Sequence, residues 1–170
     1  MMNKLILLFV LGFLACTGRM SAQKFGHVNS AMVIQAHPSI GPANLQLDAF
    51  QKSLSDPLDV KSKAFEAKYH AFVEEANSGT LSQVALQAKQ AELQNEQDSL
   101  AKEDQQIKFR LMQKREELLQ PILTEVDSII QLVGKEGKYT MIFDTSVSGA
   151  LLFAEDGNDL TETVKARLKK

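Results

Sequence analysis

The sequence has little of the chemistry that catalysis or metal binding requires. It contains one cysteine and three histidines among 170 residues, and no two histidines share a helical turn. Neither residue type therefore forms the closely spaced pair that is typical of a zinc site. The glycines form no phosphate-binding loop, and no nucleophile stands beside a recognisable base. We predict that the protein is not an enzyme and that it uses no cofactor or metal.

An excess of positive charge is also absent. The chain has 19 Lys and Arg residues against 21 Asp and Glu residues, for a formal net charge of −2. A basic stripe is the usual footprint of nucleic-acid binding, so this balance argues against a nucleic-acid partner. Contact with a membrane is compatible with the charge but is not indicated by it.

Residues 1–22 have the pattern of a signal peptide. Lys4 precedes an apolar run over residues 5–15, and small residues stand before Gln23. The run is shorter than the roughly 20 residues that a membrane-spanning helix needs. We predict that the chain is exported and cleaved before Gln23, which would remove Cys16, the only cysteine. The alternative is a lipoprotein anchored through an acylated Cys16.

The central part of the chain, residues 43–133, has the periodicity of two long amphipathic helices. In the first half, apolar residues recur at spacings of three, four or seven and so line one helical face; they are Leu47, Phe50, Leu54, Leu58, Phe65, Tyr69, Phe72 and Ala76. In the second half, one apolar residue recurs every seven while the positions midway between are polar; the series is Leu86, Leu93, Leu100 and Ile107. Both stripes are narrow. We predict an antiparallel helical hairpin, the arm, with a thin apolar seam.

The turn of this hairpin is expected near residues 77–80. Gly79 permits the backbone conformation that ends a helix, and Thr80 with Gln83 has the pattern of a capping box for the returning helix. A helix from residue 81 to residue 133 would be roughly 80 Å long at 1.5 Å per residue.

Two prolines lie within the arm. Pro57 fits the first turn of a helix capped by Asp56, so we predict a break or jog there. Pro121 lies within the strongest apolar periodicity; because proline lacks the amide hydrogen and clashes with the preceding turn, we predict a kink rather than a stop. As a hypothesis, both prolines act as hinges.

The aromatic residues of the arm allow two interpretations. Phe65, Tyr69 and Phe72 can form the seam between the two helices, or they can stay partly exposed and bind a client polypeptide. The two roles are compatible. Acidic and basic residues that are close in sequence, such as Lys102 and Glu103, are expected to pair along a solvated helix face.

The remaining residues, 23–42 and 134–170, are predicted to form a small head. Three short strands are expected, at residues 24–29, 139–144 and 150–154. Ser30 and Asp159 are expected to cap short helices, the second as a capping box with Glu162. The predicted fold class is α+β, mostly α, with the helical hairpin inserted into a head built on a three-stranded sheet. A compact part of about 55 residues is near the lower limit for an independent core, so we expect the head to oligomerise.

The order of these segments resembles the Skp/OmpH family of periplasmic chaperones. The most telling pieces are Gly26-His27-Val28-Asn29-Ser30 with His37-Pro38, the strand Tyr139 to Asp144, and Asp159-Leu160-Thr161. The resemblance implies a homotrimer whose heads join and whose arms surround a cavity in the periplasm of a Gram-negative bacterium. The cavity would hold unfolded outer-membrane β-barrel proteins without ATP.

The resemblance also implies roles for residues of the head. Six apolar residues would fill the head and its subunit contacts, namely Phe25, Val28, Ile142, Phe143, Leu151 and Leu152. The best-known family members are strongly basic whereas this chain is mildly acidic, so a lipopolysaccharide-binding role is not carried over. The alternative function is a structural coiled-coil spacer of the cell envelope that bridges fixed protein partners.

Overall fold

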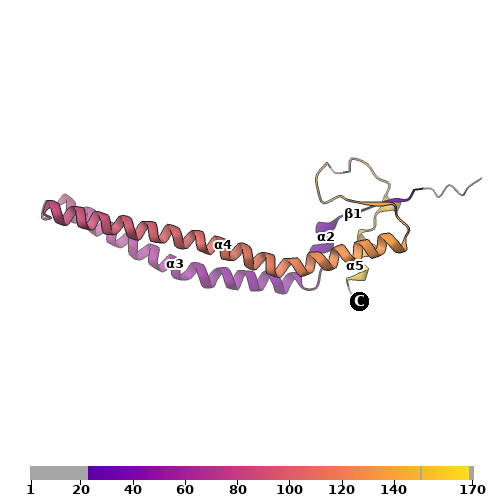
Figure 1. Cartoon of the computed structure of the whole chain (residues 1–170), viewed down its shortest axis with the longest axis horizontal. Coiled ribbons are helices and arrows are strands. Elements are labelled where there is room, and N and C mark those ends of the chain that lie inside the picture. Colours follow the sequence, from indigo (N-terminus) through magenta and orange to yellow (C-terminus); the bar gives the residue numbers. More distant parts are fainter. Residues whose placement is uncertain (1–22, 150, 169–170) are drawn as a thin grey trace, which may run out of the picture.

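The computed structural model describes residues 23–149 and 151–168, which form a long arm and a small head (Figure 1). The predicted signal peptide and the alternative acylation site at Cys16 lie outside the described residues. The elements in chain order are β1 (Phe25–Val28), α2 (Ser30–Gln35), α3 (Ile40–Asn77), α4 (Gln83–Glu136), β2 (Met141–Asp144), the 3-10 helix η1 (Asp156–Asn158) and α5 (Thr161–Arg167).

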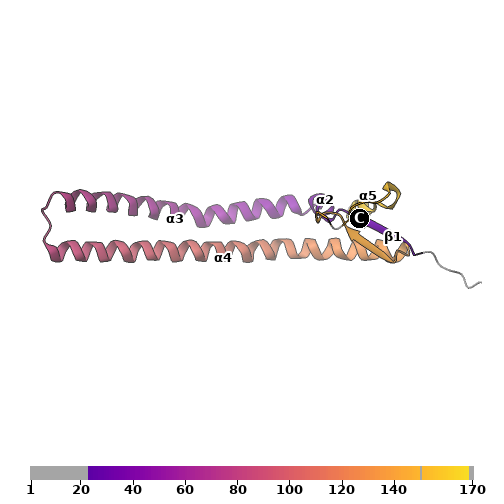
Figure 2. The same cartoon turned by 90° about the horizontal axis from the view of Figure 1, so that it is seen from above.

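The arm is the antiparallel pair of α3 and α4, which lie side by side in both views (Figures 1 and 2). Helix α3 has 38 residues and α4 has 54, so α4 is roughly 80 Å long at 1.5 Å per residue. Because α4 is the longer helix, its C-terminal part continues past α3 into the head. The predicted hairpin and its position between the two parts of the head are therefore present.

The sheet of the head joins the two ends of the chain. Strands β1 and β2 are parallel, with Phe25 opposite Met141 and Val28 opposite Asp144. The backbone amide of Leu160 donates to the carbonyl of His27 at 2.8 Å, on the edge of β1 that β2 leaves free. Residues on either side of the arm thus meet in one small unit.

The prediction of a third strand at residues 150–154 is wrong, because the described part of this segment forms no strand. Residues 151–154 have no strand conformation, and Ala150 is outside the described residues. The open edge of β1 is occupied by a single bridge between His27 and Asp159. The described sheet therefore has two strands, β1 and β2, and residues 151–154 do not form the strand that was expected beside residues 139–144.

The core of the head is packed around the end of α4. The buried cluster draws on β1, on α2 and α4, and on α5 with its two caps, and its members are Val28, Val33, Val126, Val133, Leu160, Val164 and Leu168. Val33 and Val164 are fully buried. This end of α4 is where the apolar density of the sequence is highest, and the head forms there because the apolar face of α4 is wide enough to be covered.

Three helix caps differ from the sequence prediction by one or two residues. Helix α2 is capped by Asn29, whose side chain accepts from the amide of Met32. Helix α4 is capped by Ser82 rather than Thr80, because the Thr80 hydroxyl is hydrogen-bonded to Ser78 at 2.8 Å. The predicted turn is present, and Gly79 has the positive φ of 68° that ends α3.

The cap of α5 also differs from the predicted capping box. The residue at the cap position is Leu160, and Asp159 accepts instead from the amide of Thr161 at 2.8 Å. The Glu162 carboxylate pairs with Lys165 on the same helix. Asp159 therefore stabilises the start of α5 from one residue before the observed cap position.

Both prolines lie inside continuous helices. Helix α3 passes through Pro57, so the predicted break at Asp56 is wrong, and α4 passes through Pro121, as predicted. One proline removes one backbone hydrogen bond, and the long helical segments on both sides keep the helix intact.

The junction of head and arm is marked by a buried histidine. His37 is 6% exposed and lies between α2 and α3. Its Nδ1 accepts from the amide of Ser39 at 3.1 Å, and its Nε2 lies 3.3 Å from a carboxylate oxygen of Glu125 on α4, too poorly aligned for a hydrogen bond. The side chain therefore links the start of α3 to α4 at the base of the arm.

Candidate binding surface along the helical arm

Three ion pairs connect α3 to α4 along the outer half of the arm. Both carboxylate oxygens of Glu103 accept from Lys61 at 2.7 Å, and those of Glu96 accept from Lys68 at 2.9 and 2.8 Å. The third pair joins Glu75 to Lys89 near the tip. The residues step by seven on each helix, forward on α3 and backward on α4, so each pair is a rung of one ladder. We call these three pairs the ionic ladder.

The ionic ladder was missed by the sequence analysis. We had expected Glu103 to pair with Lys102 on the same helix, whereas it pairs with Lys61 across the arm. The signal that could have revealed it is the complementary charge of residues 61, 68 and 75 and residues 103, 96 and 89 once the two helices are aligned antiparallel. The hydrogen bond with Glu96 is the main cause of the raised pKa of Lys68.

The apolar seam between the two helices is thin. In α3 only Ala43 is buried, and in α4 the buried residues are Ile107, Ile122, Val126 and Val133. Beyond Ile107 toward the tip, no residue of α4 is buried. The outer arm is therefore held by half-buried side chains and ion pairs rather than by a core, which leaves its surface open to other molecules.

The three predicted aromatic residues do not share one environment. Phe65 and Phe72 are half-buried, whereas Tyr69 is 50% exposed. The rings of Phe65 and Tyr69 lie 6.4 Å apart, and Phe72 lines a hollow between the helices together with Leu93. Phe65 and Phe72 are thus placed as seam residues, and Tyr69 is placed as a surface residue.

Other apolar side chains are exposed along the whole arm. They are spread over both helices, and they are Leu45, Val60, Val84, Phe109 and Met112, each more than half exposed. Such dispersed contacts can touch an extended polypeptide at many points, but they cannot enclose a small ligand.

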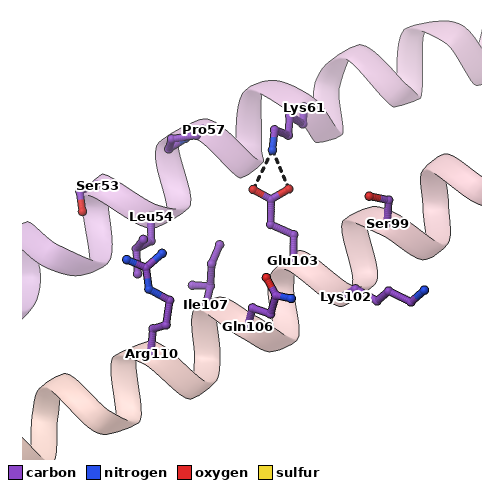
Figure 3. Close-up of a pocket in the computed structure, with 10 residues that line it drawn as sticks. All are labelled: Ser53, Leu54, Pro57, Lys61, Ser99, Lys102, Glu103, Gln106, Ile107 and Arg110. Atoms are coloured by element: carbon purple, nitrogen blue, oxygen red, sulfur yellow. Dashed lines mark hydrogen bonds and ion pairs between the residues drawn. The ribbon is translucent and has the colours of Figure 1, made fainter.

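A cavity opens between the helices beside Pro57 (Figure 3). Its volume is about 480 Å³, and Lys61 with Glu103 closes one side of it. Ile107 is the buried residue at its floor, and Arg110 reaches from α4 toward Leu54 on α3. The cavity lies where the ionic ladder ends and the wider apolar seam begins.

The six apolar residues assigned to the head fall into two groups. Val28 is buried in the core and Ile142 packs against it. Phe25 and Phe143 lie on the opposite face of the sheet, 43% and 39% exposed, with ring centroids 6.4 Å apart. Leu151 is half-buried and Leu152 is 94% exposed. Only the first group fills the head of the protomer itself.

Polar side chains from both ends of the chain meet at the N-terminus of α2. The Asp144 carboxylate accepts from the Ser30 hydroxyl at 2.5 Å and from the Ser30 amide at 3.1 Å. Partial burial raises the pKa of Asp144, but the hydrogen bonds from Ser30 and Ser146 outweigh it and hold the pKa below its ordinary value. Asp144 on β2 therefore stabilises the first turn of α2.

A second polar group links β1 to α5. The Thr161 hydroxyl accepts from the amide of Asn29 at 3.0 Å and donates to Asp159 at 2.6 Å. The bond from Thr161 is the main reason that the pKa of Asp159 lies below its ordinary value, with a smaller effect of His27. Asn29, Asp159 and Thr161, which belong to the segments that carry the family resemblance, thus have a structural role: they join the two ends of the chain in the head.

Within residues 23–149 and 151–168, no three His, Cys, Asp or Glu residues gather as a metal site would require. Of the helices described, none has an apolar stretch long enough to cross a bilayer.

Comparisons with known proteins bear on this architecture. The family model of outer membrane protein (OmpH-like) matches residues 24–168. Among solved structures, the chain is similar to that of a candidate OmpH-like outer membrane chaperone from Caulobacter crescentus. The TM-score is 0.64 at 19% identity, over 89% of this chain and 87% of that chain, a likeness of fold. No curated protein matches the sequence.

Proposed function

The chain belongs to the OmpH-like family of outer membrane proteins, and from this premise we propose that it is an ATP-independent holdase chaperone of the periplasm. It binds unfolded outer-membrane β-barrel proteins between helical arms and prevents their aggregation. A holdase needs no catalytic group, only a surface that binds unfolded chains in preference to folded ones.

The observation that carries this proposal is the open, sparsely apolar arm. Its exposed apolar residues are dispersed over both helices, and no residue of the outer part of α4 is buried. Many weak contacts suit a protein that must bind diverse sequences and release them again. Tyr69, at the surface of the outer arm, is one of the contacts that we assign to the client.

A homotrimer would convert three arms into a cavity. The head of one protomer is small, and it leaves Phe25, Phe143 and Leu152 exposed. Burial of these side chains against other copies would complete a core that one chain cannot build alone. We therefore assign Phe25, Phe143 and Leu152 to the contacts between heads.

The rival function, a structural spacer, also has an observation in its favour. The ionic ladder holds α3 and α4 in one register, as a rigid spacer would require. A rigid spacer needs helices that its prolines do not interrupt, and both α3 and α4 continue through theirs. A spacer, however, would bury its seam along the whole arm, and this arm buries almost none of its outer half.

The deciding experiment measures aggregation. An unfolded outer-membrane β-barrel protein is diluted out of urea, without ATP, and light scattering is followed with and without the mature chain. We expect suppression at a stoichiometry of one client to three chains, with the mass of the chaperone determined in parallel. Full aggregation in the presence of the correctly folded chain would contradict the proposal and favour the spacer.

A matched variant links the result to the arm. Replacement of Tyr69, Phe109 and Met112 by serine removes exposed apolar surface without touching a buried residue. We expect its suppression of aggregation to be weaker, with unchanged helix content. The corresponding change of exposed polar residues Gln51, Gln113 and Gln120 to serine is the control and should have no effect.

A further inference from the structure

The ionic ladder has a fourth position at which the pairing fails. Seven residues before Lys61 on α3 is Leu54, and seven residues after Glu103 on α4 is Arg110. The next rung therefore sets an arginine against a leucine. Figure 3 shows Arg110 extending from α4 toward Leu54, at the edge of the cavity beside Pro57.

Arg110 has a positive charge that the neighbouring carboxylate does not neutralise. Glu103 is the one acidic residue that lines the cavity, and both of its oxygens accept from Lys61. Within residues 23–149 and 151–168, Arg110 makes no ion pair. Lys102 also lines the cavity but points away from Arg110 (Figure 3). The cavity thus carries more positive charge than negative.

The guanidinium group is held in place from one side only. It lies over the ring of Phe50, 5.6 Å from the ring centroid, which restrains its orientation and leaves its donors free. The planar fork of an arginine binds a carboxylate through two parallel hydrogen bonds. Gln106 also lines the cavity, where its amide can donate a further hydrogen bond.

We propose that this cavity binds a carboxylate side chain of a captured polypeptide, which supplies the acid that the fourth rung lacks. The inference rests on the proposed function and identifies one chemical contact within it. A cavity of about 480 Å³ is many times the roughly 30 Å³ share of a water molecule, so an Asp or Glu side chain enters with part of its hydration. Arg110 is itself exposed, so the ion pair forms at the mouth of the cavity, where the planar guanidinium supplies the geometry.

The first test compares two fluorescent 12-residue peptides that differ only in four Glu residues replaced by four Gln residues. We expect the mature chain to bind the Glu peptide more tightly, and Arg110→Gln to lower that affinity a few-fold, as the loss of an ion pair at an exposed arginine should. Arg115→Gln, the same charge change on the same helix outside the cavity, is the control and should have little effect.

The second test supplies the missing acid from the chain itself. Leu54→Glu should pair with Arg110 and exclude the peptide carboxylate, so that the Glu peptide binds as weakly as it does to Arg110→Gln. Leu54→Gln has the same shape without the charge and should retain binding. Equal binding of the Glu peptide by these two variants would overturn the proposal. An Arg110→Gln variant that still prefers the Glu peptide as strongly as the wild type does would overturn it too.

Inorganic phosphate separates a general anion site from a carboxylate site. If phosphate at the concentration of the peptide abolishes its binding, the cavity accepts any anion and the proposed ligand is wrong. The same preparations are assayed for suppression of β-barrel aggregation. If the wild-type chain suppresses aggregation but binds both peptides equally, the inference fails while the holdase function stands; if it suppresses none, the function itself fails.

Discussion

At the scale of single residues, the head is closed by a few polar side chains that come from opposite ends of the chain. Asp144 binds the first residue of α2, and Thr161 connects Asn29 to Asp159. Each bond joins residues more than a hundred positions apart, apart from the local bond between Thr161 and Asp159. These contacts fix how the ends of the chain meet, which the small apolar core alone would leave loose.

Replacement of Asp144 by Asn tests this role. We expect the free energy of unfolding at pH 7 to fall by about 1 kcal/mol, because a partly exposed charge-assisted contact is lost. The folded pKa of Asp144 is below its ordinary value of 3.8, so its stabilisation is present above that pH and declines as the pH falls below it. Urea unfolding at pH 7 and pH 3 should show the difference between wild type and variant shrink at the lower pH.

Two glycines provide an opposite pair of substitutions. A Cβ at Gly26 would lie 2.9 Å from a methyl group of Leu160 and 3.0 Å from the ring of Tyr139, so Gly26→Ala should destabilise the head by roughly 1–3 kcal/mol. Gly41, in the first turn of α3, has no atom within 4 Å of that position, and Gly41→Ala should stabilise the helix by about 0.5–1 kcal/mol. Thermal unfolding measures both, and a stable Gly26→Ala variant would contradict the packing.

At the scale of elements, the arm is a pair of helices far longer than the head that supports them. Isolated helices are marginal in water, so α3 and α4 depend on each other along their whole length. Near the head they share apolar packing, and toward the tip they share the ionic ladder. The arm thus changes its mode of stabilisation along its length, beside the cavity at Pro57.

The ionic ladder predicts a dependence on salt. Lys61→Glu sets two like charges across the arm and should lower the thermal stability of the arm in dilute buffer, and the swapped pair Lys61→Glu with Glu103→Lys should restore it. An exposed pair contributes only a few tenths of a kcal/mol, and the effect should vanish in about 1 M salt, where the screening length is about 3 Å. A loss that persists in high salt would show that Lys61 acts through packing instead.

The hinge hypothesis for Pro57 and Pro121 is tested by restoring the missing hydrogen bonds. Pro57→Ala gives the Ser53 carbonyl a donor and should raise the stability of the arm by about 1–3 kcal/mol. If the arm bends there to fit large clients, this variant and Pro121→Ala should suppress the aggregation of large β-barrels less well and that of small ones normally. Unchanged suppression for both sizes would reject the hinges.

At the scale of the whole molecule, the protomer is a long arm that projects from a small head (Figure 2). The sheet of the head has one covered and one open face. The covered face of the sheet packs Val28 and Ile142 against the helices, and the open face presents Phe25, Met141 and Phe143. An open aromatic face on so small a unit favours association with other copies.

This asymmetry predicts the effect of a charge on the open face. Phe143→Asp should reduce the mass in solution from that of the proposed trimer to that of one chain while the helix content stays the same, because Phe143 is not part of the buried core. Light scattering coupled to gel filtration gives the mass. Phe109→Asp, at an exposed aromatic residue of the arm, is the matched control and should keep the mass of three chains. A trimer that survives Phe143→Asp would place the subunit contact elsewhere.

The sequence by itself determined the elements of the arm and their order. The spacing of apolar residues predicted two long helices, and Gly79 marked the turn between them. These features follow from backbone hydrogen bonds and side-chain spacing within about four residues, which are local properties. The strands at residues 25–28 and 141–144 were also predicted, within two residues at each end.

Only the tertiary structure decided which side chains meet. The bond of Lys61 to Glu103 depends on the alignment of α3 with α4, and a shift of one residue would separate every rung of the ionic ladder. Asp159 bridges His27 at the free edge of β1, because the packing of α5 on α4 brings that segment beside the strand. Contacts between residues far apart in the chain depend on the relative placement of whole elements, and no local pattern specifies that placement.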